Sequence, residues 1–398
     1  MTEMMGGFPP RDDALVTLAN WRLAPFNQWA FHHVREIVPT ADIPNDPAYM
    51  RDLPEQPLDP GEVRITAPDG RRLSFDAFLQ ETSTDGIVAI HRGRIVLERY
   101  AHGMNAETPH ILMSVSKSML GLLAGVLADK GILDVERPAT DFVPELATTA
   151  YNGVTVRQLL DMRAGVAFGE DYLATSGPII SYRKATNWNP LAPGDTPIDL
   201  RSFFQELTEP DGPHGGRFHY ISPNTDLLGW VIERAANRRY ADLMSELIWR
   251  PMGAYRSASI TVDRLGAPRS SGGLCTTTRD LALVGLLIAD GGAGNGRQIV
   301  PRAWVEDILR NGDEEAWRQG PFVDYFRGAA MHYRANWYVR RGRAPLVIAS
   351  GIHGQCLFVD SERQLIVAKL ASHPSPLNAD QLALSMAAME ALREVVSR

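Results

Sequence analysis

The chain is poor in cysteine and has no marked charge bias. Its only cysteines among 398 residues are Cys275 and Cys356, which stand among apolar or small neighbours. Two cysteines are too few for a disulfide framework, so both are predicted to be buried free thiols. The net charge of -7 comes from 47 acidic and 40 basic residues without a long run of one sign. This argues against a nucleic-acid groove or a membrane patch and favours a small substrate that is uncharged or of mixed charge.

Targeting segments and several site motifs are also absent. Residues 1–20 lack a basic segment followed by an apolar run, so no secretory signal is expected. No window reaches the roughly 18 apolar residues of a membrane span, and a cytoplasmic protein is predicted. His-Glu-x-x-His and Cys-x-x-Cys do not occur, so neither a metal nor a cofactor is expected. The absence of Gly-x-Ser-x-Gly excludes the α/β-hydrolase nucleophile elbow.

Strand patterns lie near both chain ends, with helical patterns between them. Apolar residues 87–90 and 95–97 flank His91-Arg92-Gly93, which is the pattern of a hairpin. Pro251 is expected to end one helix, and the glycines of residues 291–296 follow a helix, which indicates a turn and not a nucleotide loop. Further strands are predicted over 336–339, 345–348, 356–359 and 365–369, and helices over 113–130, 156–162, 224–234, 240–249, 279–289 and 379–396.

This order predicts an α/β (α+β) fold with one antiparallel sheet built from both chain ends, flanked by helices, and an inserted helical region. A content of 44% hydrophobic residues allows a large core. Trp21, Trp29 and Phe31 form an aromatic cluster that is expected to pack an N-terminal extension on the main body. The predicted boundaries are 1–60 for the extension and 61–398 for the main domain, with 61–133 and 265–398 as its α/β part and 134–264 as its helical part.

The motif Ser-x-x-Lys occurs as Ser114-Val-Ser-Lys117, directly before the most apolar helix pattern of the chain. On a first helical turn positions i and i+3 share a face, so the Lys117 amine reaches the Ser114 hydroxyl. A lysine partly desolvated against an apolar helix loses its proton more easily and can act as the base for a serine nucleophile. The alternative is that Ser114 caps the helix while Lys117 stays in solvent. On the motif alone, the two interpretations are equally well supported.

The same motif recurs as Ser181-Tyr-Arg-Lys184. That copy lies in a polar stretch without an apolar helix behind it, so it is interpreted as a coincidence in a loop. Only the first copy is a candidate site.

A second element is Tyr220, which precedes an apolar helix pattern. A tyrosine hydroxyl near a lysine amine can pass a proton to a leaving group. Ser222, two residues further along an extended segment, points the same way. Taken alone, a tyrosine in this place is more often a core residue, so its role depends on its partners.

A third element is Ala349-Ser-Gly351-Ile-His353, between two predicted strands. Glycine lets the backbone approach a bound carbonyl closely, and the strand amides can form half of an oxyanion hole. The amide of Ser114 would form the other half. The alternative, a hairpin turn with His353 on the surface, is favoured by the motif in isolation.

Taken together and in this order, the three elements resemble the marks of the serine β-lactamase and penicillin-binding superfamily, which are Ser-x-x-Lys, Tyr-x-Asn and Lys-Thr-Gly. Here they are Ser114-Val-Ser-Lys117, Tyr220-Ile-Ser222 and Ala349-Ser-Gly351. Within the class C-like branch, which includes carboxylesterases, the chain resembles the 6-aminohexanoate-dimer hydrolases, which act on nylon oligomers. The segments that carry this likeness run from residue 27 to residue 355. The resemblance implies a β-lactamase-like fold for the main domain.

The resemblance also implies a role for each matching residue. Ser114 is the nucleophile, Lys117 the base and Tyr220 the proton relay. The amides of Ser114 and Ile352 form the oxyanion hole. Substrate contacts are expected from Tyr172, beside the scissile nitrogen, from Trp188, on a mobile covering loop, and from Arg183, Ser222, Ser271 and His353.

Two departures from the superfamily pattern limit the substrate. Ala349 replaces the lysine of Lys-Thr-Gly and Ser222 replaces the asparagine of Tyr-x-Asn. The groups that would hold the carboxylate and the acyl side chain of a β-lactam are therefore missing, and antibiotic hydrolysis is expected to be poor. The covering segment 173–188 contains Arg183 and Lys184 but no acid, so an ammonium-ended substrate finds no counter-charge there. Hydrolysis of a short-chain ester needs no such counter-charge.

These observations predict a serine hydrolase that cleaves a small amide or ester through an acyl-enzyme on Ser114, as an amidase of the 6-aminohexanoate-dimer hydrolase type with carboxylesterase activity. A carboxylesterase alone, a D-amino-acid peptidase and a non-catalytic binding protein on the same fold remain alternatives. The lack of an expected secretory signal and Ala349 disfavour the peptidase, and the intact Ser114, Lys117 and Tyr220 disfavour the binder. The acyl-chain length, the resting protonation of Lys117 and Tyr220, the selection of acidic substrates by Arg183 and the oligomeric state, a homodimer included, stay open.

Overall fold

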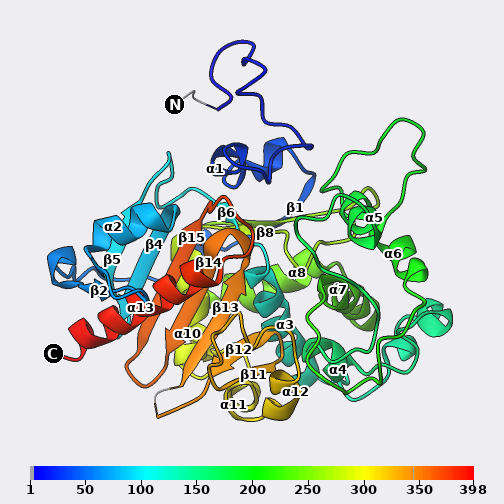
Figure 1. Ribbon diagram of the computed structural model, residues 1–398. Coiled ribbons are helices and arrows are strands. Elements are labelled where there is room, and N and C mark those ends of the chain that lie inside the picture. Colours follow the sequence, from blue (N-terminus) through cyan, green and yellow to red (C-terminus); the bar gives the residue numbers. More distant parts are fainter. Residues whose placement is uncertain (1–3, 344) are drawn as a thin grey trace.

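A seven-stranded antiparallel sheet built from both chain ends lies at the centre of the structure (Figure 1). This computed structural model describes residues 4–343 and 345–398, so the first three residues of the predicted extension lie outside the described part. The strands are β4 Thr84–His91, β5 Arg94–Tyr100, β11 Met331–Arg334, β12 Trp337–Arg340, β13 Leu346–Gly351, β14 Gln355–Asp360 and β15 Leu365–Ala371. Their order is β11-β12-β13-β14-β15-β4-β5, and β15 pairs with β4 to join the two chain ends. The predicted sheet is confirmed.

Tight turns define the two edges of this sheet. Arg92 and Gly93 have positive φ angles of 48° and 75° between β4 and β5, as a two-residue hairpin turn requires, so the predicted hairpin is confirmed. Ala335 and Asn336 have positive φ angles of 48° and 65° between β11 and β12. The strand predicted over 336–339 therefore begins one residue later, and β11 lies where no strand was predicted.

Helices cover both faces of the sheet. α3 (Val115–Asp129) and α10 (Thr278–Ala289) pack on one face, and α13 (Ala379–Val396) crosses the other (Figure 1). Because side chains alternate along a strand, Val347 and Ala349 of β13 join the core under α3 and α10, whereas Ile348 joins the core under α13. The three predicted helices are confirmed.

The region between the strands of the large sheet is mostly helical. It contains α4 Val156–Leu160, α5 Pro178–Ala185, α6 Leu200–Phe203, α7 Ser222–Ala236 and α8 Tyr240–Met244. One strand, β7 (Ala258–Thr261), also falls within residues 134–264, which were expected to be helical.

The helix predicted over 240–249 does not stop at Pro251. After α8 the chain continues through a π-helical turn, Ser245–Trp249, and α9, Arg250–Met252. The amide of Arg250 bonds five residues back, and Pro251 stands in the first turn of α9, where its missing N–H costs least. The helix ends instead at Gly253, whose φ is 79°.

The second Ser-x-x-Lys copy lies in α5, so its predicted placement in a loop was wrong. Pro178 starts this helix with a fixed helical φ, and Ile179 and Tyr182 form its buried face. The serine and the lysine of this copy contact acids instead: Ser181 Oγ donates to Glu206 at 3.1 Å, and Lys184 pairs with Asp195 at 2.5 Å.

The N-terminal extension is built into the main body. β1 (Thr40–Ile43) pairs with β7 in a four-stranded sheet that is completed by β8 (Leu274–Thr276) and β6 (His110–Ile111). Trp21 and Phe31 are buried and cluster with Met113 and Trp188, and Trp29 is partly buried beside them. No strand was predicted in this extension, and the domain boundaries stay a prediction.

The remaining elements are short or peripheral. The glycine-rich stretch contains the predicted turn, which joins two short strands, β9 and β10, that were not predicted. Cys275 and Cys356 are buried free thiols, which confirms that prediction. In residues 4–343 and 345–398, no helix has both the length and the apolar composition needed to cross a membrane. The other bounds are α1 Phe26–Ala30, β2 Ile65–Thr66, β3 Arg72–Leu73, α2 Phe75–Glu81, β9 Ala293–Gly294, β10 Arg297–Gln298, α11 Arg302–Arg310 and α12 Glu314–Arg318, with 3₁₀ turns at Val34–Glu36, Pro47–Tyr49, Pro60–Glu62, Ala139–Asp141, Pro144–Thr148, Phe204–Glu206 and Ile352–Gly354.

Candidate active site

Ser114 stands at the start of α3 with its hydroxyl free of a capping role. Its backbone is helical, and its side chain makes no capping hydrogen bond. The preceding Met113 has a positive φ of 46°, a strained conformation for a residue with a side chain, of the kind found near active sites. Lys117 is only 1% exposed. The alternative in which Ser114 caps the helix and Lys117 lies in solvent is therefore wrong.

The ammonium group of Lys117 has three hydrogen-bond partners. Nζ donates to Ser114 Oγ at 2.9 Å, to Ser222 Oγ at 3.0 Å and to the carbonyl of Ser271 at 2.7 Å. Burial lowers the pKa of this amine to about 8, while the charge of Glu170 opposes the change. The neutral amine is thus accessible near neutral pH, and it lies in contact with a serine hydroxyl.

Tyr220 lies beside the same amine. Lys117 Nζ is 4.9 Å from the centroid of the Tyr220 ring. Burial, and after it the charge of Glu170, raises the pKa of the phenol well above its usual value, whereas the hydroxyls of Ser114 and Tyr338 act in the opposite direction. As the pH rises, Lys117 therefore loses its proton before Tyr220 does. Next to the Ser114 hydroxyl, the neutral amine of Lys117 can thus act as a base and the protonated phenol of Tyr220 as an acid.

The end of β13 approaches Ser114 closely. A Cβ atom on Gly351 would lie 2.9 Å from the carbonyl oxygen of Leu112 and 3.0 Å from the amide nitrogen of Ser114, so a larger residue would have to displace backbone. Ile352, the next residue, lines the same cavity as Ser114. Two backbone segments thus meet where an oxyanion hole would need its donors.

His353 does not line this cavity. Its φ is 62°, and its Nδ1 lies 2.7 Å from the carbonyl oxygen of His373. The ring packs edge-on against Phe31 at 5.1 Å between centroids and is 3% exposed. The expected surface position of His353 was wrong, because the N-terminal extension covers it. The substrate contact expected from His353 is therefore not supported by its position.

A cavity opens beside Ser114. Its walls come from α5, α7, the N-terminal extension and the segment before β8. Trp188 is 4% exposed and its indole N–H donates to Thr261 at 3.2 Å, so it is also a packing anchor. The other predicted substrate-binding residues that line the cavity are Tyr172, Arg183, Ser222 and Ser271.

Glu170 is a cavity residue that sequence reasoning missed. Its carboxylate accepts hydrogen bonds from the Tyr172 hydroxyl at 2.9 Å, from the Ser222 amide at 2.6 Å and from the Ser222 hydroxyl. Ser222 therefore connects Lys117 to Glu170. The sequence feature that could have pointed to Glu170 is its position two residues before Tyr172, a predicted substrate-binding residue. It lies just outside residues 173–188, so the expected lack of acid in that segment does not describe the whole cavity.

A buried ion pair between Asp226 and Arg269 was also missed. Asp226 is 1% exposed and accepts hydrogen bonds from the Ser271 amide at 2.7 Å, the Ser271 hydroxyl at 3.0 Å and the Tyr182 hydroxyl at 2.5 Å. Arg269 pairs with the same carboxylate. Because the Ser271 carbonyl accepts a hydrogen bond from Lys117, this pair holds the base in place.

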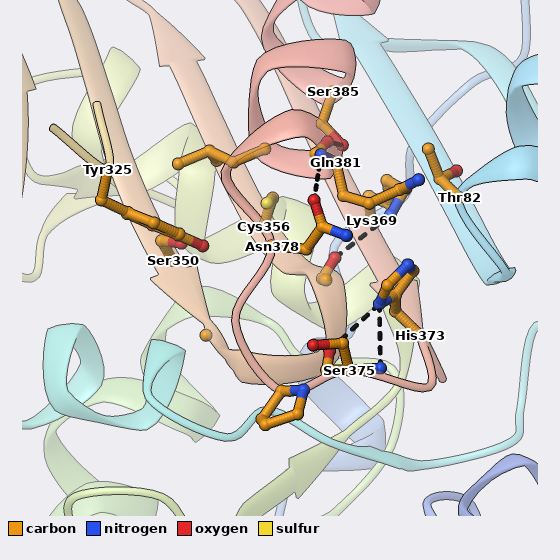
Figure 2. A pocket seen from close by; sticks show the side chains of 14 residues that line it. Thr82, Tyr325, Ser350, Cys356, Lys369, His373, Ser375, Asn378, Gln381 and Ser385 are labelled. Carbon is orange, nitrogen blue, oxygen red and sulfur yellow. Dashed lines mark hydrogen bonds between the residues drawn. The ribbon is translucent and has the colours of Figure 1, made fainter. Parts of the chain in front are cut away.

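A second cavity lies behind β13, on the face covered by α13 (Figure 2). Ser350, Cys356 and Lys369 are neighbours across β13, β14 and β15 and line it together. Lys369 is 2% exposed, and Nζ donates to the carbonyl of Gly354 at 3.2 Å. Burial lowers the pKa of this amine. No serine hydroxyl accepts a hydrogen bond from it within the described residues, so this cavity lacks the contact that defines the first one.

Comparison with known proteins agrees with this geometry. Residues 74–388 match the family described as Beta-lactamase. The chain is 36% identical over 361 residues to the 6-aminohexanoate-dimer hydrolase of Paenarthrobacter ureafaciens, with 90% of this chain and 89% of that protein covered. A solved structure described as "Putative 6-aminohexanoate-dimer hydrolase from Bacillus anthracis" has a TM-score of 0.88 and 26% identity, over 98% of this chain and 99% of that one. A family VIII carboxylesterase has a TM-score of 0.59 and 18% identity, over 80% of this chain and 95% of that one.

Proposed function

The chain belongs to the β-lactamase family, and on that basis we propose that it hydrolyses amide or ester bonds of small linear substrates through an acyl-enzyme on Ser114. The observation that carries the proposal is the 2.9 Å contact between Lys117 Nζ and Ser114 Oγ. A hydroxyl is a weak nucleophile near neutral pH and needs a base. A buried amine whose pKa is about 8 can supply one.

In the first step the neutral Lys117 amine accepts the proton of Ser114 as Oγ attacks the substrate carbonyl. Negative charge moves to the carbonyl oxygen, where the amides of Ser114 and Ile352 stabilise it. The leaving nitrogen or oxygen takes a proton from the Tyr220 phenol, and Tyr220 recovers a proton from Lys117. The C–N or C–O bond breaks, and the acyl group stays on Ser114.

Water then releases the acyl group. The neutral Lys117 amine takes a proton from a water molecule that attacks the acyl-enzyme carbonyl. The bond to Ser114 Oγ breaks, and the lysine returns the proton to the serine. One water molecule is consumed for each amide or ester bond, and the free enzyme is restored.

The preferred substrates are linear amides like the 6-aminohexanoate dimer, the compound for which the 36% identical relative is named. Ala349 is fully buried and brings no cation to the cavity, and Ser222 is already bonded to Lys117 and Glu170. Hydrolysis of β-lactam antibiotics is therefore expected to be poor. A cytoplasmic location and a homodimer stay predictions.

A carboxylesterase without useful amidase activity is the second candidate. Glu170 is the only acid that lines the cavity in the described part of the chain, and Ser222 and Tyr172 already engage it. An ammonium-ended dimer would have to compete for that carboxylate. An alkoxide also leaves without the full protonation that an amine requires. Both points favour esters.

The experiment compares wild type with Ser114→Ala on 4-nitrophenyl butyrate and on the linear 6-aminohexanoate dimer. Ser181→Ala is the matched control, because it removes the serine of the other Ser-x-x-Lys copy. Loss of both activities in Ser114→Ala alone supports the mechanism, and the wild-type ratio of the two rates distinguishes amidase from esterase. If the wild type cleaves neither compound, the proposal fails and a binding protein is the better description.

A further inference from the structure

The cavity beside Ser114 carries an excess of positive charge. Arg22, Arg183 and Arg269 all line it, whereas Glu170 is its only acid in the described part of the chain. Arg269 is neutralised by Asp226. Neither Arg22 nor Arg183 forms an ion pair within the described residues. Two guanidinium groups therefore face this cavity without an ion-pair partner in the described part of the chain.

Arg183 is held in place by groups that carry no charge. It is 7% exposed, and its N–H groups donate to the backbone carbonyls of Tyr172 at 2.9 Å and Ala174 at 3.3 Å. Carbonyl oxygens fix the orientation of a guanidinium group but do not neutralise it. A buried charge without a partner is costly unless a ligand supplies one.

Arg22 comes from the N-terminal extension and reaches the same cavity. It donates to Asn189 Oδ1 at 2.5 Å and to the carbonyl of Trp188 at 3.5 Å. Its Nε–H is buried and has no hydrogen-bond partner within the described residues. Burial and the charges of Arg183 and Arg269 lower the pKa of Arg22 to about 9. The three guanidinium groups thus lie close enough to repel one another.

Glu170 offsets these charges only in part, because its single charge acts on both Arg183 and Arg269. Its oxygens accept hydrogen bonds from Ser222 and Tyr172, and through Ser222 it is part of the surroundings of Lys117. From this arrangement we propose that the substrate carries a carboxylate, which binds Arg22 and Arg183 when its amide or ester group lies at Ser114. Arginine suits this task because its planar N–H groups match a carboxylate in geometry and charge.

This inference rests on the proposed function and names the substrate class. The carboxylate could belong to the acyl part or to the leaving part of the substrate. The 6-aminohexanoate dimer carries one on its leaving part, and a dicarboxylic acid half-ester carries one on its acyl part. The cavity chemistry is the same in both cases, so the experiment must separate them.

Two substrate pairs make that separation. Mono-4-nitrophenyl adipate is compared with 4-nitrophenyl hexanoate for the acyl side, and 4-(butanoyloxy)benzoate with its methyl ester for the leaving side. In the wild type, we expect kcat/KM for the acidic member of one pair to exceed that of its neutral partner about tenfold or more. The gain should lie mainly in KM, because the carboxylate binds in both the ground state and the transition state.

The variants Arg22→Met and Arg183→Met should each lower kcat/KM for the preferred acidic substrate about 10- to 100-fold, as expected for the loss of a charge-assisted hydrogen bond. The deciding quantity is the ratio of kcat/KM for the acidic substrate to kcat/KM for its neutral partner, which should fall about 10-fold or more in each variant whatever change the two substrates share. Arg22→Lys keeps the charge and should keep part of the preference. Arg318→Met is the matched control, because this arginine is 69% exposed on α12. It should leave kcat/KM for both substrates unchanged.

Equal rates within both pairs in the wild type would overturn the proposal, and so would a preference that survives both arginine variants. A wild type that cleaves none of the four compounds would instead count against the proposed function. If Arg183→Met lowers the melting temperature so far that it cannot be assayed, Arg22→Met alone decides the question, because Arg22 is bonded only to loop residues 188 and 189.

Discussion

The two buried lysines on opposite sides of β13 are almost equally buried but differ in their chemistry. Lys117 is 1% exposed and Lys369 is 2% exposed. Burial lowers the pKa of both amines, and neither forms an ion pair within the described residues. Lys117 contacts two serine hydroxyls, whereas Lys369 contacts one backbone carbonyl. Burial therefore prepares an amine to lose its proton, but only contact with a hydroxyl makes it a base for nucleophilic attack.

The support around the two lysines also differs. The Asp226–Arg269 pair fixes the carbonyl that accepts a hydrogen bond from Lys117. The partner of Lys369 is the carbonyl of Gly354, in the turn between β13 and β14, and this amine lies in a cavity that no acid lines within the described residues (Figure 2). A catalytic amine is thus set apart by the network that positions it as well as by its burial.

The comparison is tested by replacing each lysine with methionine. Of all the tests proposed, this one should give the largest change in activity. Lys117→Met should lower kcat/KM for 4-nitrophenyl butyrate about 1000-fold, because a positioned general base contributes about 100- to 10,000-fold. Lys369→Met, a variant matched in burial and side-chain change, should stay within about twofold of wild type. A large loss in both variants would mean that buried charge in general supports activity, and the comparison would fail.

The pH profile gives the next largest effect. Only the neutral Lys117 amine accepts the Ser114 proton, and its pKa is about 8. Below pH 8, kcat/KM should therefore rise about tenfold per pH unit and level off above that value. The same profile in Lys369→Met would assign the titration to Lys117. A profile that is flat between pH 6 and 9 would contradict the proposed base.

The parts of this site that were predictable are those that lie close together in the sequence. Ser114 and Lys117 are three residues apart before an apolar helix, so helical geometry alone brings them together. The alternating strands and the hairpin at residue 92 were predictable for the same reason, since each depends on a short-range pattern.

The missed parts depend on contacts between distant segments. Glu170 meets Ser222 across 52 residues, and Asp226 meets Arg269 across 43. Arg22 reaches the cavity from an extension that the sequence indicated only as a packing element. Nothing in the local pattern of an acid or an arginine distinguishes such a residue from one on a solvated surface. The position of His353 also depended on a distant segment, because Phe31 covers it.

Glu170→Gln tests whether this acid acts on the base through its charge. The charge of Glu170 raises the pKa of Lys117 and opposes the effect of burial, so its removal should move the midpoint of the pH profile to lower pH, by about half a unit. Glutamine keeps similar size and hydrogen-bonding capacity, so a role limited to packing would leave the midpoint at about 8. An upward shift would contradict the proposed sign.

The smallest expected effect is on the stability of the fold, which the buried amine of Lys369 lowers. In the unfolded chain its amine keeps a proton up to its ordinary pKa of 10.5, whereas burial lowers the folded pKa. Between those two values the unfolded state binds more protons, so wild-type stability should rise with pH through that window. Lys369→Met removes the buried amine, and its melting temperature should exceed that of wild type by about 2 °C at pH 7, with a smaller difference at pH 10. A melting temperature below wild type at pH 7 would mean instead that the hydrogen bond to Gly354 outweighs the cost of burial, and that both lysines are stabilised by their partners.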